Sequence, residues 1–466
     1  MNIKEQESNA SWSHSEFGHA ELGNRARTRR LVSMSEQAAN RPAGKVTEIF
    51  NTSAEKEGAY KFIEKESVQE RAVAKAAHVA CARRCAEHAF VFVPVDGSSL
   101  AIKDGHQVKG LGPIGHSKTK TSGLEVMSAI AVLPDGTPMG ICGQSFWARP
   151  RKKLEMSESQ RRNRPLEEKE TNYWFETIQQ TQSVFQETCK SCTPWFQLDR
   201  GGDFREMLLW AEKTNARVTI RGSRNRRVAD KETQYILEEL TAKPLLGSYD
   251  LNVIQGPNRQ ARVAHMEVRG CQVQLMLGNQ WNKKVQLCTL HAILVCEIGT
   301  APTSEKPIEW LLLTNYEVKN FDDARLVIFG YTQRWRIEEF HKTWKSTCRV
   351  EDSQLRDAGR IKLMAIILAS VAMRIERLKY LARTSPDLPA TVEFNQYEID
   401  AIILQRKPKG YRRGSTPPIG LAVKWLADLG GYTGKSSGGP PGSIVIGRGL
   451  RYIQGAVDVL ETLSQN

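Results

Sequence analysis

The segment Ala89-Phe-Val-Phe-Val-Pro-Val95 is a short apolar run, and Asp96-Gly-Ser-Ser99 follows it directly. A run of this length, rich in β-branched and aromatic residues, predicts a buried β-strand. The first polar side chain after the run is a carboxylate, so we expect Asp96 at the carboxyl end of the strand. Mixed α/β sheets often place their chemistry at such strand ends. The segment therefore predicts an α/β fold with a candidate site beside Asp96.

The residues that follow extend this pattern as far as a second acid. Pro194–Leu198 is another apolar run, and it delivers Asp199 at its end. Between the two acids, Pro134-Asp-Gly-Thr137 is a hairpin signal. Three strands, a helix, a strand, a helix and a strand predict one mixed α/β sheet. We expect the further strands at residues 124–133, 138–146 and 216–221, and the helices at about 167–188 and 203–214.

The rest of the chain divides into regions of different character. Residues 222–315 alternate apolar and polar side chains in short runs, which predicts an antiparallel β insertion. Continuous helices are expected over 322–346 and 360–384, and a helical region with Pro- and Gly-rich breaks follows. The expected domains are residues 1–70, a helical unit; 71–384, the α/β domain with its β insertion at about 222–315; and 385–466, the C-terminal helical region.

The segment from Tyr331 to Lys345 combines two helix faces of opposite character. Ile337, Phe340 and Trp344 form an apolar stripe that predicts docking on a core. The opposite arc carries a carboxylate among cations and aromatics, a mixture unusual for a surface helix. The members of that polar arc are Tyr331, Arg334, Trp335, Glu338, Lys342 and Lys345. The alternative interpretation is a salt-bridge network that braces two helices.

Three acids on separate elements point to metal-dependent phosphoryl transfer. Asp96, Asp199 and Glu338 are candidate ligands for two Mg²⁺ or Mn²⁺ ions, which require several carboxylates converging from different elements. Cations nearby would bind DNA phosphates, and aromatic side chains would stack on an unpaired base. Each strand-end aspartate alone is more often a turn-former or helix cap.

The overall charge agrees with a polyanionic partner. The chain of 466 residues has a net charge of +14 and a pI of about 9.3, which favours nucleic acid, although a merely basic protein is an equal alternative. At the N-terminus, Arg25, Arg27, Arg29 and Arg30 fall within six residues. They predict a small helical DNA-binding unit, or else a solvated basic helix.

Membrane and nucleotide sites are not expected. No stretch approaches the roughly 20 apolar residues of a membrane span, and the first thirty residues contain no secretory signal, so we expect a cytoplasmic protein. Gly434-Lys-Ser436 looks like the end of a P-loop, but Leu429 occupies the position of the required glycine.

The spacing Tyr331-x-x-Arg334-x-x-x-Glu338-x6-Lys345 resembles the signature of the DDE cut-and-paste transposases of bacterial insertion-sequence family four. The resemblance covers nearly the whole chain, with a departure at Gly201-Gly202, a looser turn than is usual in that family. Other segments that resemble the family are Leu22-Gly23, Glu57–Ile63, Asp96–Ser99, Asp199-Arg200-x-x-Asp203, Trp310–Thr314 and Leu426–Tyr432.

The resemblance implies a multidomain α/β protein. Its ribonuclease-H-like catalytic domain would carry a β-rich insertion, between a helical N-terminal DNA-binding domain and a mainly helical C-terminal region used for dimerisation. It implies Asp96, Asp199 and Glu338 as ligands of Mg²⁺ or Mn²⁺. The chain would bind the terminal inverted repeats of an element, excise it through a hairpin intermediate and join its 3′ ends to target DNA. The partners would be double-stranded DNA and a second copy of the chain. The protein would act in the bacterial cytoplasm, in association with the nucleoid.

Individual DNA contacts are also implied. Tyr331, Arg334 and Lys345 would hold the DNA terminus, and Trp310 would stack on a flipped base. Arg221 and Trp335 match neighbours of that pocket, and Lys342, Arg27 and Arg30 complete the expected DNA contacts. The alternative for Trp310 is a core tryptophan of the β insertion.

Two other functions remain open. The chain could be a catalytically silent DNA-binding regulator of transposition, but all three acids and the N-terminal arginines are present. It could also be a structure-selective nuclease with the same metal chemistry. The N-terminal helical unit and the insertion bearing Trp310 favour a transposase over a nuclease.

Overall fold

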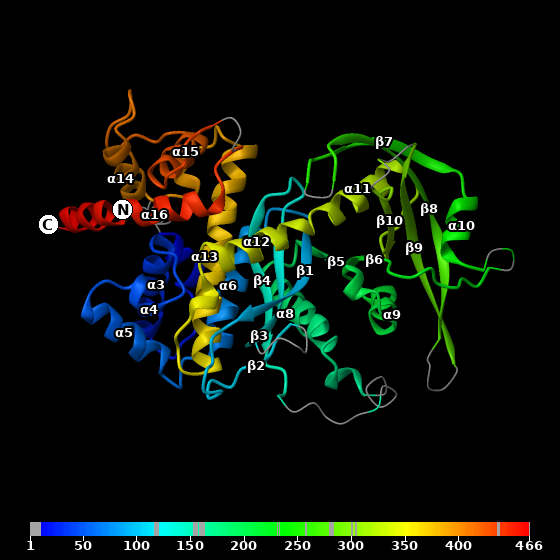
Figure 1. Cartoon of the computed structure of the whole chain (residues 1–466), viewed down its shortest axis with the longest axis horizontal. Coiled ribbons are helices and arrows are strands. Elements are labelled where there is room, and N and C mark those ends of the chain that lie inside the picture. The colour runs from blue at the N-terminus through cyan, green and yellow to red at the C-terminus, as the bar shows by residue number, and fades with distance from the viewer. Residues whose placement is uncertain are drawn as a thin grey trace.

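The computed structural model describes residues 11–115, 121–151, 157, 164–230, 232, 234–256, 259–278, 284–299, 302, 305–435 and 439–465. Figure 1 shows the helices of both chain ends gathered on one side and a long β extension on the other, with α12 between them. Within the described residues, no helix is both long and apolar enough to cross a membrane.

A mixed sheet forms the centre of the molecule, as the sequence predicts. Its central part has the order β4-β3-β1-β5-β6. The first three strands pair antiparallel, whereas β1–β5 and β5–β6 pair parallel. This arrangement agrees with the ribonuclease-H-like fold that the resemblance of the motifs implies. The strands are β1 (Phe90–Ala101), β3 (Ser122–Val132), β4 (Pro138–Trp147), β5 (Thr193–Leu198) and β6 (Arg217–Arg221), and a short β2 (Gly112–Pro113) pairs with β3.

Strand β1 is longer than the sequence predicts, and Asp96 lies within it rather than at its end. Parallel pairing with β5 stops at Val95↔Leu198, but antiparallel pairing with β3 continues to Ala101↔Gly123. The prediction was wrong because the polar residues after Asp96 still have ladder partners on β3. Asp96 therefore sits where one neighbouring strand ends and the other continues.

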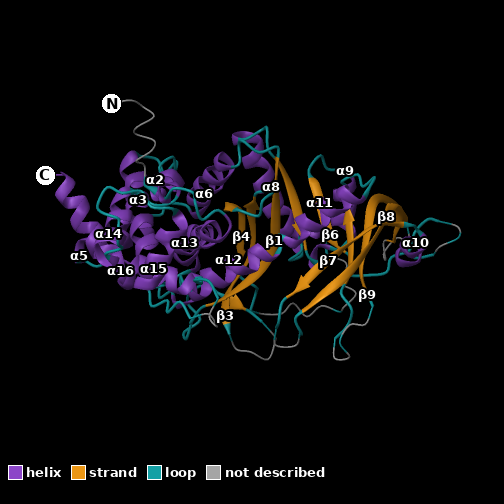
Figure 2. Cartoon of the chain, turned by 90° about the horizontal axis from the view of Figure 1, so that it is seen from above, coloured by secondary structure: helices purple, strands orange, loops and turns teal. Residues whose placement is uncertain are grey.

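Helices cover the two faces of this central sheet, as Figure 2 shows. Side chains alternate along a strand, so Phe92 on β1 and Trp195 on β5 pack on one face with α12 and α13, while Val93 and Phe196 pack on the other. The covering helices are α8 (Asn172–Thr188), α9 (Arg205–Lys213), α12 (Trp335–Ser346) and α13 (Ala358–Thr384).

The β insertion continues the central sheet instead of forming a separate module. Strand β10 pairs antiparallel with β6, and β9, β8 and β7 follow in order. The antiparallel pattern was predicted, but α10 within the insertion was not. These elements are β7 (Leu245–Val253), β8 (Arg262–Gly278), β9 (Val285–Ile298), β10 (Glu309–Thr314) and α10 (Ile236–Ala242).

The continuous helix predicted over 322–346 is broken into α11 (Phe321–Thr332) and α12. The N–H of Gln333 donates to the carbonyls of both Phe329 and Gly330, and the N–H of Arg334 donates to Tyr331. This tightening to three-residue hydrogen bonds separates α11 from α12. Tyr331 therefore belongs to a different helix from Glu338. The predicted apolar stripe of α12 is confirmed, because Ile337, Phe340 and Trp344 are fully buried.

The helices of the two chain ends pack around α13 in one buried cluster. Residues ahead of Gly434 form a helix, not the strand that a P-loop requires; Ser436 lies outside the described residues. The N-terminal helices are α2 (Trp12–Phe17), α3 (Arg25–Asn40), α4 (Val46–Ile49), α5 (Ser53–Ile63) and α6 (Glu70–Arg84), and the C-terminal ones are α14 (Gln396–Arg406), α15 (Ile419–Leu429) and α16 (Ser443–Gln465).

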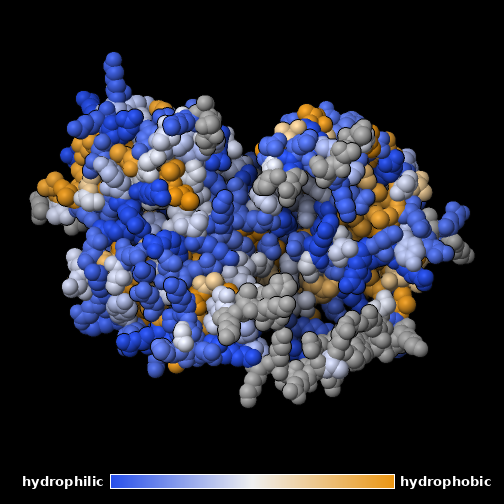
Figure 3. All heavy atoms as spheres, viewed as in Figure 1, coloured by the Kyte–Doolittle hydropathy of each residue, from blue (hydrophilic) through white to orange (hydrophobic). Residues whose placement is uncertain are grey.

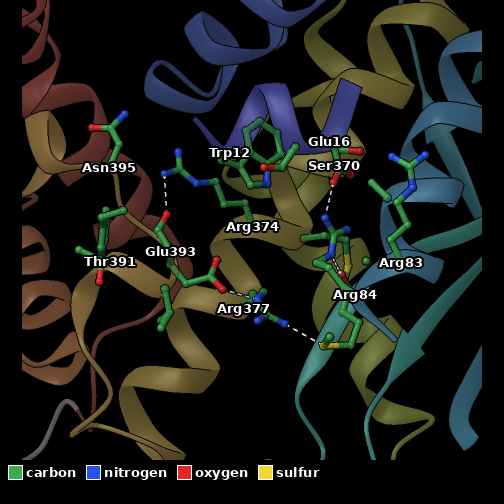
Figure 4. A pocket seen from close by; sticks show the side chains of 17 residues that line it. Trp12, Glu16, Arg83, Arg84, Ser370, Arg374, Arg377, Thr391, Glu393 and Asn395 are labelled. Carbon is green, nitrogen blue, oxygen red and sulfur yellow. Dashed lines mark hydrogen bonds and ion pairs between the residues drawn. The ribbon is translucent and has the colours of Figure 1, made fainter. Parts of the chain in front are cut away.

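A pocket of about 490 Å³ lies where α2 meets α6, β4 and α13 (Figure 4). Two of its arginines are paired with acids of the same region: Arg84 with Glu16 at 2.8 Å and Arg377 with Glu393. The guanidinium carbon of Arg374 also lies 5.4 Å from the ring centre of Trp12. The Trp12 contact joins α2 to α13, and Arg84 of α6 also donates to the carbonyl of Met139 on β4 at 2.8 Å.

Candidate active site

Asp96 and Asp199 lie side by side on neighbouring strands. The last parallel pair of β1 and β5 is Val95↔Leu198, and each aspartate is the next residue of its strand. Alternation places both on the face of Phe92 and Trp195, which α12 covers. The sheet register alone therefore directs two carboxylates toward α12.

Arg334 connects Asp96 to the third acid. Its Nη1 donates to Oδ2 of Asp96 at 3.0 Å, and its Nη2 donates to Oε1 of Glu338 at 2.5 Å. The Glu338 contact is the helical i,i+4 pair that the motif spacing provides. Although Tyr331 lies on another helix, the predicted association of Arg334 with Glu338 is present.

Burial and the charges of the neighbouring carboxylates change the protonation of Asp96. Burial raises the pKa of Asp96 to about 6, helped by the charges of Asp199 and Glu338 and opposed by Arg334 and the N–H of Gly97. A cation beside these oxygens would relieve the repulsion. Carboxylate oxygens are also the ligands that Mg²⁺ and Mn²⁺ prefer.

The donor set thus fits a divalent metal, but its side chains are held apart. Among the described residues, no three His, Cys, Asp or Glu side chains lie close enough together to hold one ion. The physical reason is the guanidinium of Arg334, which stands between Asp96 and Glu338 and compensates both charges. An ion bound by all three acids would have to replace that guanidinium.

The turn after Asp199 explains the two glycines that follow it. Oδ1 of Asp199 accepts the N–H of Gly201 at 2.7 Å and caps the short 3-10 turn Arg200–Gly202. A Cβ on Gly202 would lie 2.8 Å from Cβ of Leu198, and one on Gly201 would lie 2.9 Å from Oδ1 of Asp199. Close approach, rather than looseness, requires glycine here.

Asp203 holds the loop beyond β6 and was not predicted as a site residue. Its carboxylate is fully buried and accepts hydrogen bonds from the N–H and hydroxyl of Ser223, each at 2.7 Å. It also pairs with Arg226 at 2.6 Å. These contacts fix the segment that follows Arg221 against the turn that follows Asp199.

Next to the acids is a pocket of about 460 Å³ that contains most of the predicted DNA contacts. The guanidinium carbon of Arg221 lies 5.6 Å from the ring centre of Trp310 and 5.8 Å from that of Tyr331. Trp310 is partly buried and packs against the edge of the buried core, with part of its ring exposed. Arg200 also lines the pocket and was not predicted. The predicted residues in this lining are Asp199, Arg221, Trp310, Tyr331, Arg334 and Trp335.

The other predicted residues lie elsewhere. Glu338 and Lys342 line a neighbouring groove together with Trp335, which is 61% exposed. Lys345 is half-buried beside His341 and lines neither hollow. Figure 3 shows the molecule hollowed between its helical side and its β extension, with mainly hydrophilic residues along the hollow.

The two N-terminal arginines lie on α3, away from the acids (Figure 1). Nη1 of Arg27 donates to the carbonyl of Leu22 at 2.9 Å, so this side chain supports the loop before α3. Arg30 is exposed and lies across Gly58 of α5, where a Cβ would come within 2.8 Å of its Nη1.

Comparisons with known proteins show the family to which the chain belongs. A family model described as transposase DNA-binding matches residues 9–68, and one described as transposase DDE domain matches residues 142–374, half of the chain. The second match includes Asp199 and Glu338 but begins after Asp96. A cryo-EM structure of the piggyBac transposase synaptic complex with hairpin DNA matches with a TM-score of 0.34 and 10% identity, over 80% of this chain and 71% of that chain. That similarity is too low to inform the site. On the two family matches, the chain belongs to the DDE transposases.

Proposed function

We propose that this transposase binds the terminal inverted repeats of its element and cleaves the DNA at each end with a site built from Asp96, Asp199 and Glu338. The freed 3′ ends would then be joined to target DNA. The observation that carries the proposal is the convergence of three acids from two strands and a helix beside a pocket of aromatic and cationic side chains.

Bound Mg²⁺ or Mn²⁺, two per site, would activate the attacking oxygen and stabilise the leaving oxygen of a phosphodiester. The carboxylates would hold the cations, and the partial burial of Asp96 reduces the screening of these charges by water. In the displacement, the bond from phosphorus to the attacking water or 3′-hydroxyl forms as the bond to the leaving oxygen breaks. No covalent bond to the protein is needed.

The pocket of Trp310, Tyr331 and Arg221 is suited to an unpaired base at the end of the element. The rings of Trp310 and Tyr331 meet edge to face with centres 5.8 Å apart, and Arg221 is held by the carbonyl of Glu309. A base drawn out of the duplex would gain stacking there. This supports a hairpin intermediate, in which the freed 3′-hydroxyl attacks the opposite strand.

The finer family assignment is also a proposal. The spacing of Tyr331, Arg334, Glu338 and Lys345 supports insertion-sequence family four, and Lys345 together with Lys342 would contact phosphates near the end. Because the chain is strongly basic, we propose that it acts on DNA at the bacterial nucleoid.

A homodimer is proposed to hold two ends together. Helix α16 presents an exposed apolar face at helical spacing, formed by Tyr452, Val459 and Leu463, which are 57%, 58% and 64% exposed. Gly455 lies on the same face, and a Cβ there would meet nothing. A second copy of α16 would cover this face. Sedimentation of wild type and Val459→Asp on end DNA tests this: only wild type should form the two-protein complex.

Cleavage of a labelled duplex that carries the element's terminal repeat tests the proposed function. We expect nicking at the end with Mg²⁺ and none with EDTA, followed by a hairpin product. Specific binding without cleavage in Mg²⁺ or Mn²⁺ would instead identify a silent DNA-binding regulator. Cleavage without preference for the repeat would identify a structure-selective nuclease.

A further inference from the structure

A groove of about 580 Å³ runs along α12 and meets the pocket of Trp310, Tyr331 and Arg221, here called the base pocket, at Trp335. One wall is α12, with Trp335, Glu338 and Lys342. The floor includes Lys379 and Arg383 of α13, and the far wall includes Tyr432, Pro440 and the first turn of α16. The groove thus unites three regions that are far apart in sequence.

The groove continues the catalytic pocket. Trp335 lines both hollows, Asp199 lines the first and Glu338 lines the second. Arg334 lines the first hollow and bridges Asp96 to Glu338. The acids therefore stand between the two hollows, so a strand held in one and cut at the acids would continue into the other.

The charges of the groove favour a polyanion. Glu339 is compensated by Arg336 at 2.8 Å and by Lys379 at 3.3 Å, and Glu338 is compensated by Arg334. Lys342 and Arg383, by contrast, are exposed and have no acidic partner among the described residues. The uncompensated charge is positive, as a phosphodiester backbone requires.

The far wall is held in position by its own hydrogen bonds. Glu376 of α13 accepts the hydroxyls of Thr343 and Ser443, at 2.5 and 2.8 Å, so it ties α12 to the start of α16. Arg383 donates to the carbonyl of Pro441 at 2.8 Å. The N-terminal turn of α16 then faces the groove, and its N–H groups add to the attraction for phosphate. The wall is preformed, so binding orders few groups.

We propose that this groove binds the flanking DNA that continues beyond the cleavage point, with Arg383 contacting its phosphates. The proposal rests on the proposed function, because it takes the base pocket to hold the end of the element. Arg383 would then add affinity for an uncleaved end, which still carries flanking DNA. It would add none for an end that has already been released.

The test compares the salt dependence of binding for two DNA probes, the terminal repeat with a long flank and the same repeat ending flush at the cleavage point. For Arg383→Ala we expect the slope of log affinity against log salt to fall by about 1 with flanked DNA. The slope with flush DNA should not change. Arg383→Lys should keep the wild-type slope, since the charge remains.

Lys424→Ala on α15 is the matched control, because Lys424 is an exposed cation outside both hollows. It should leave both slopes unchanged. Equal slopes for wild type and Arg383→Ala on flanked DNA would overturn the proposal. An equal fall in slope on the flanked and the flush probe would also overturn it. Since the readout is binding, these results are distinct from a failure of wild type to cleave, which would refute the proposed function instead.

Discussion

Arg334 Nη1 lies 3.0 Å from Oδ2 of Asp96, so a cationic side chain from α12 occupies the space between two proposed metal ligands. The same guanidinium holds Glu338 through the next turn of the helix. In the absence of metal it compensates charges that burial would otherwise make costly. We expect bound metal to release this guanidinium for a DNA phosphate.

Replacing Arg334 should therefore make the protein more dependent on metal for its stability. Arg334→Ala removes two charge-assisted hydrogen bonds, which we expect to cost about 1–3 kcal/mol in EDTA. Part of that loss should return with Mg²⁺, so the rise in melting temperature on adding Mg²⁺ should exceed that of wild type. Arg336→Ala is the control, because Arg336 pairs with Glu339 instead. An equal Mg²⁺ response in wild type and Arg334→Ala would contradict this role.

Trp310 should bind an unpaired base at the end of the element. Trp310→Ala is expected to weaken that stacking by about 1–3 kcal/mol, whereas Trp310→Phe should retain much of it. A fluorescent base analogue at the terminal position reports stacking directly through its quenching on binding. Identical quenching by wild type and Trp310→Ala would remove Trp310 from the base pocket.

The two arginines of α3 should differ in effect. Arg30 is exposed, so Arg30→Ala should reduce the salt slope of end binding by about 1 without changing the melting temperature. Arg27 also anchors Leu22, so Arg27→Ala should weaken binding and lower the melting temperature. Filter binding over a salt series, with thermal melts alongside, separates the two. An unchanged slope for Arg30→Ala would place it outside the DNA interface.

Two buried histidines should make the protein sensitive to acid. Burial lowers the pKa of His78 to about 4, and burial with the charge of Lys345 lowers that of His341 to about 3, from an ordinary 6.5. Below pH 6.5 the unfolded chain binds protons that the folded protein does not, so stability falls as the pH drops toward these values. At about pH 5 each histidine should cost about 2 kcal/mol.

Denaturant unfolding at about pH 7 and about pH 5 measures this loss. Between these two pH values, His78→Leu should lose about 2 kcal/mol less stability than wild type, which is the loss expected from one histidine. If His78→Leu and wild type lost the same stability between the two conditions, His78 would not be a source of the acid sensitivity.

The sequence could predict what depends on local pattern. Asp199 was correctly placed after a strand, because the run from Pro194 ends where a tight turn begins. The apolar stripe of α12 followed from its spacing. Asp96 was placed at a strand end wrongly, because its further partners on β3 are invisible in the local pattern. The break at Gln333 was missed because both flanking segments have helical character.

Which residues lie next to the three acids depends on tertiary contacts, so the sequence predicts these residues less well. Arg221 and Trp310 come from paired strands of the extended sheet, and only the resemblance of the motifs indicated that they meet. Nothing in the sequence near Arg383 or Tyr432 indicates that they face Lys342 across a groove. Such pairings arise from the packing of α13 and the C-terminal segment.

The most direct test of the account compares Glu338→Gln with Glu339→Gln in single-turnover cleavage of end DNA at saturating protein with Mg²⁺. The two acids are adjacent on α12, but Glu338 is bridged to Asp96 while Glu339 is held by Arg336 and Lys379. We predict that Glu338→Gln binds the end and does not cleave it, and that Glu339→Gln cleaves at a rate near that of wild type. Cleavage by Glu338→Gln at the wild-type rate would contradict the assignment of Asp96, Asp199 and Glu338 as the catalytic centre.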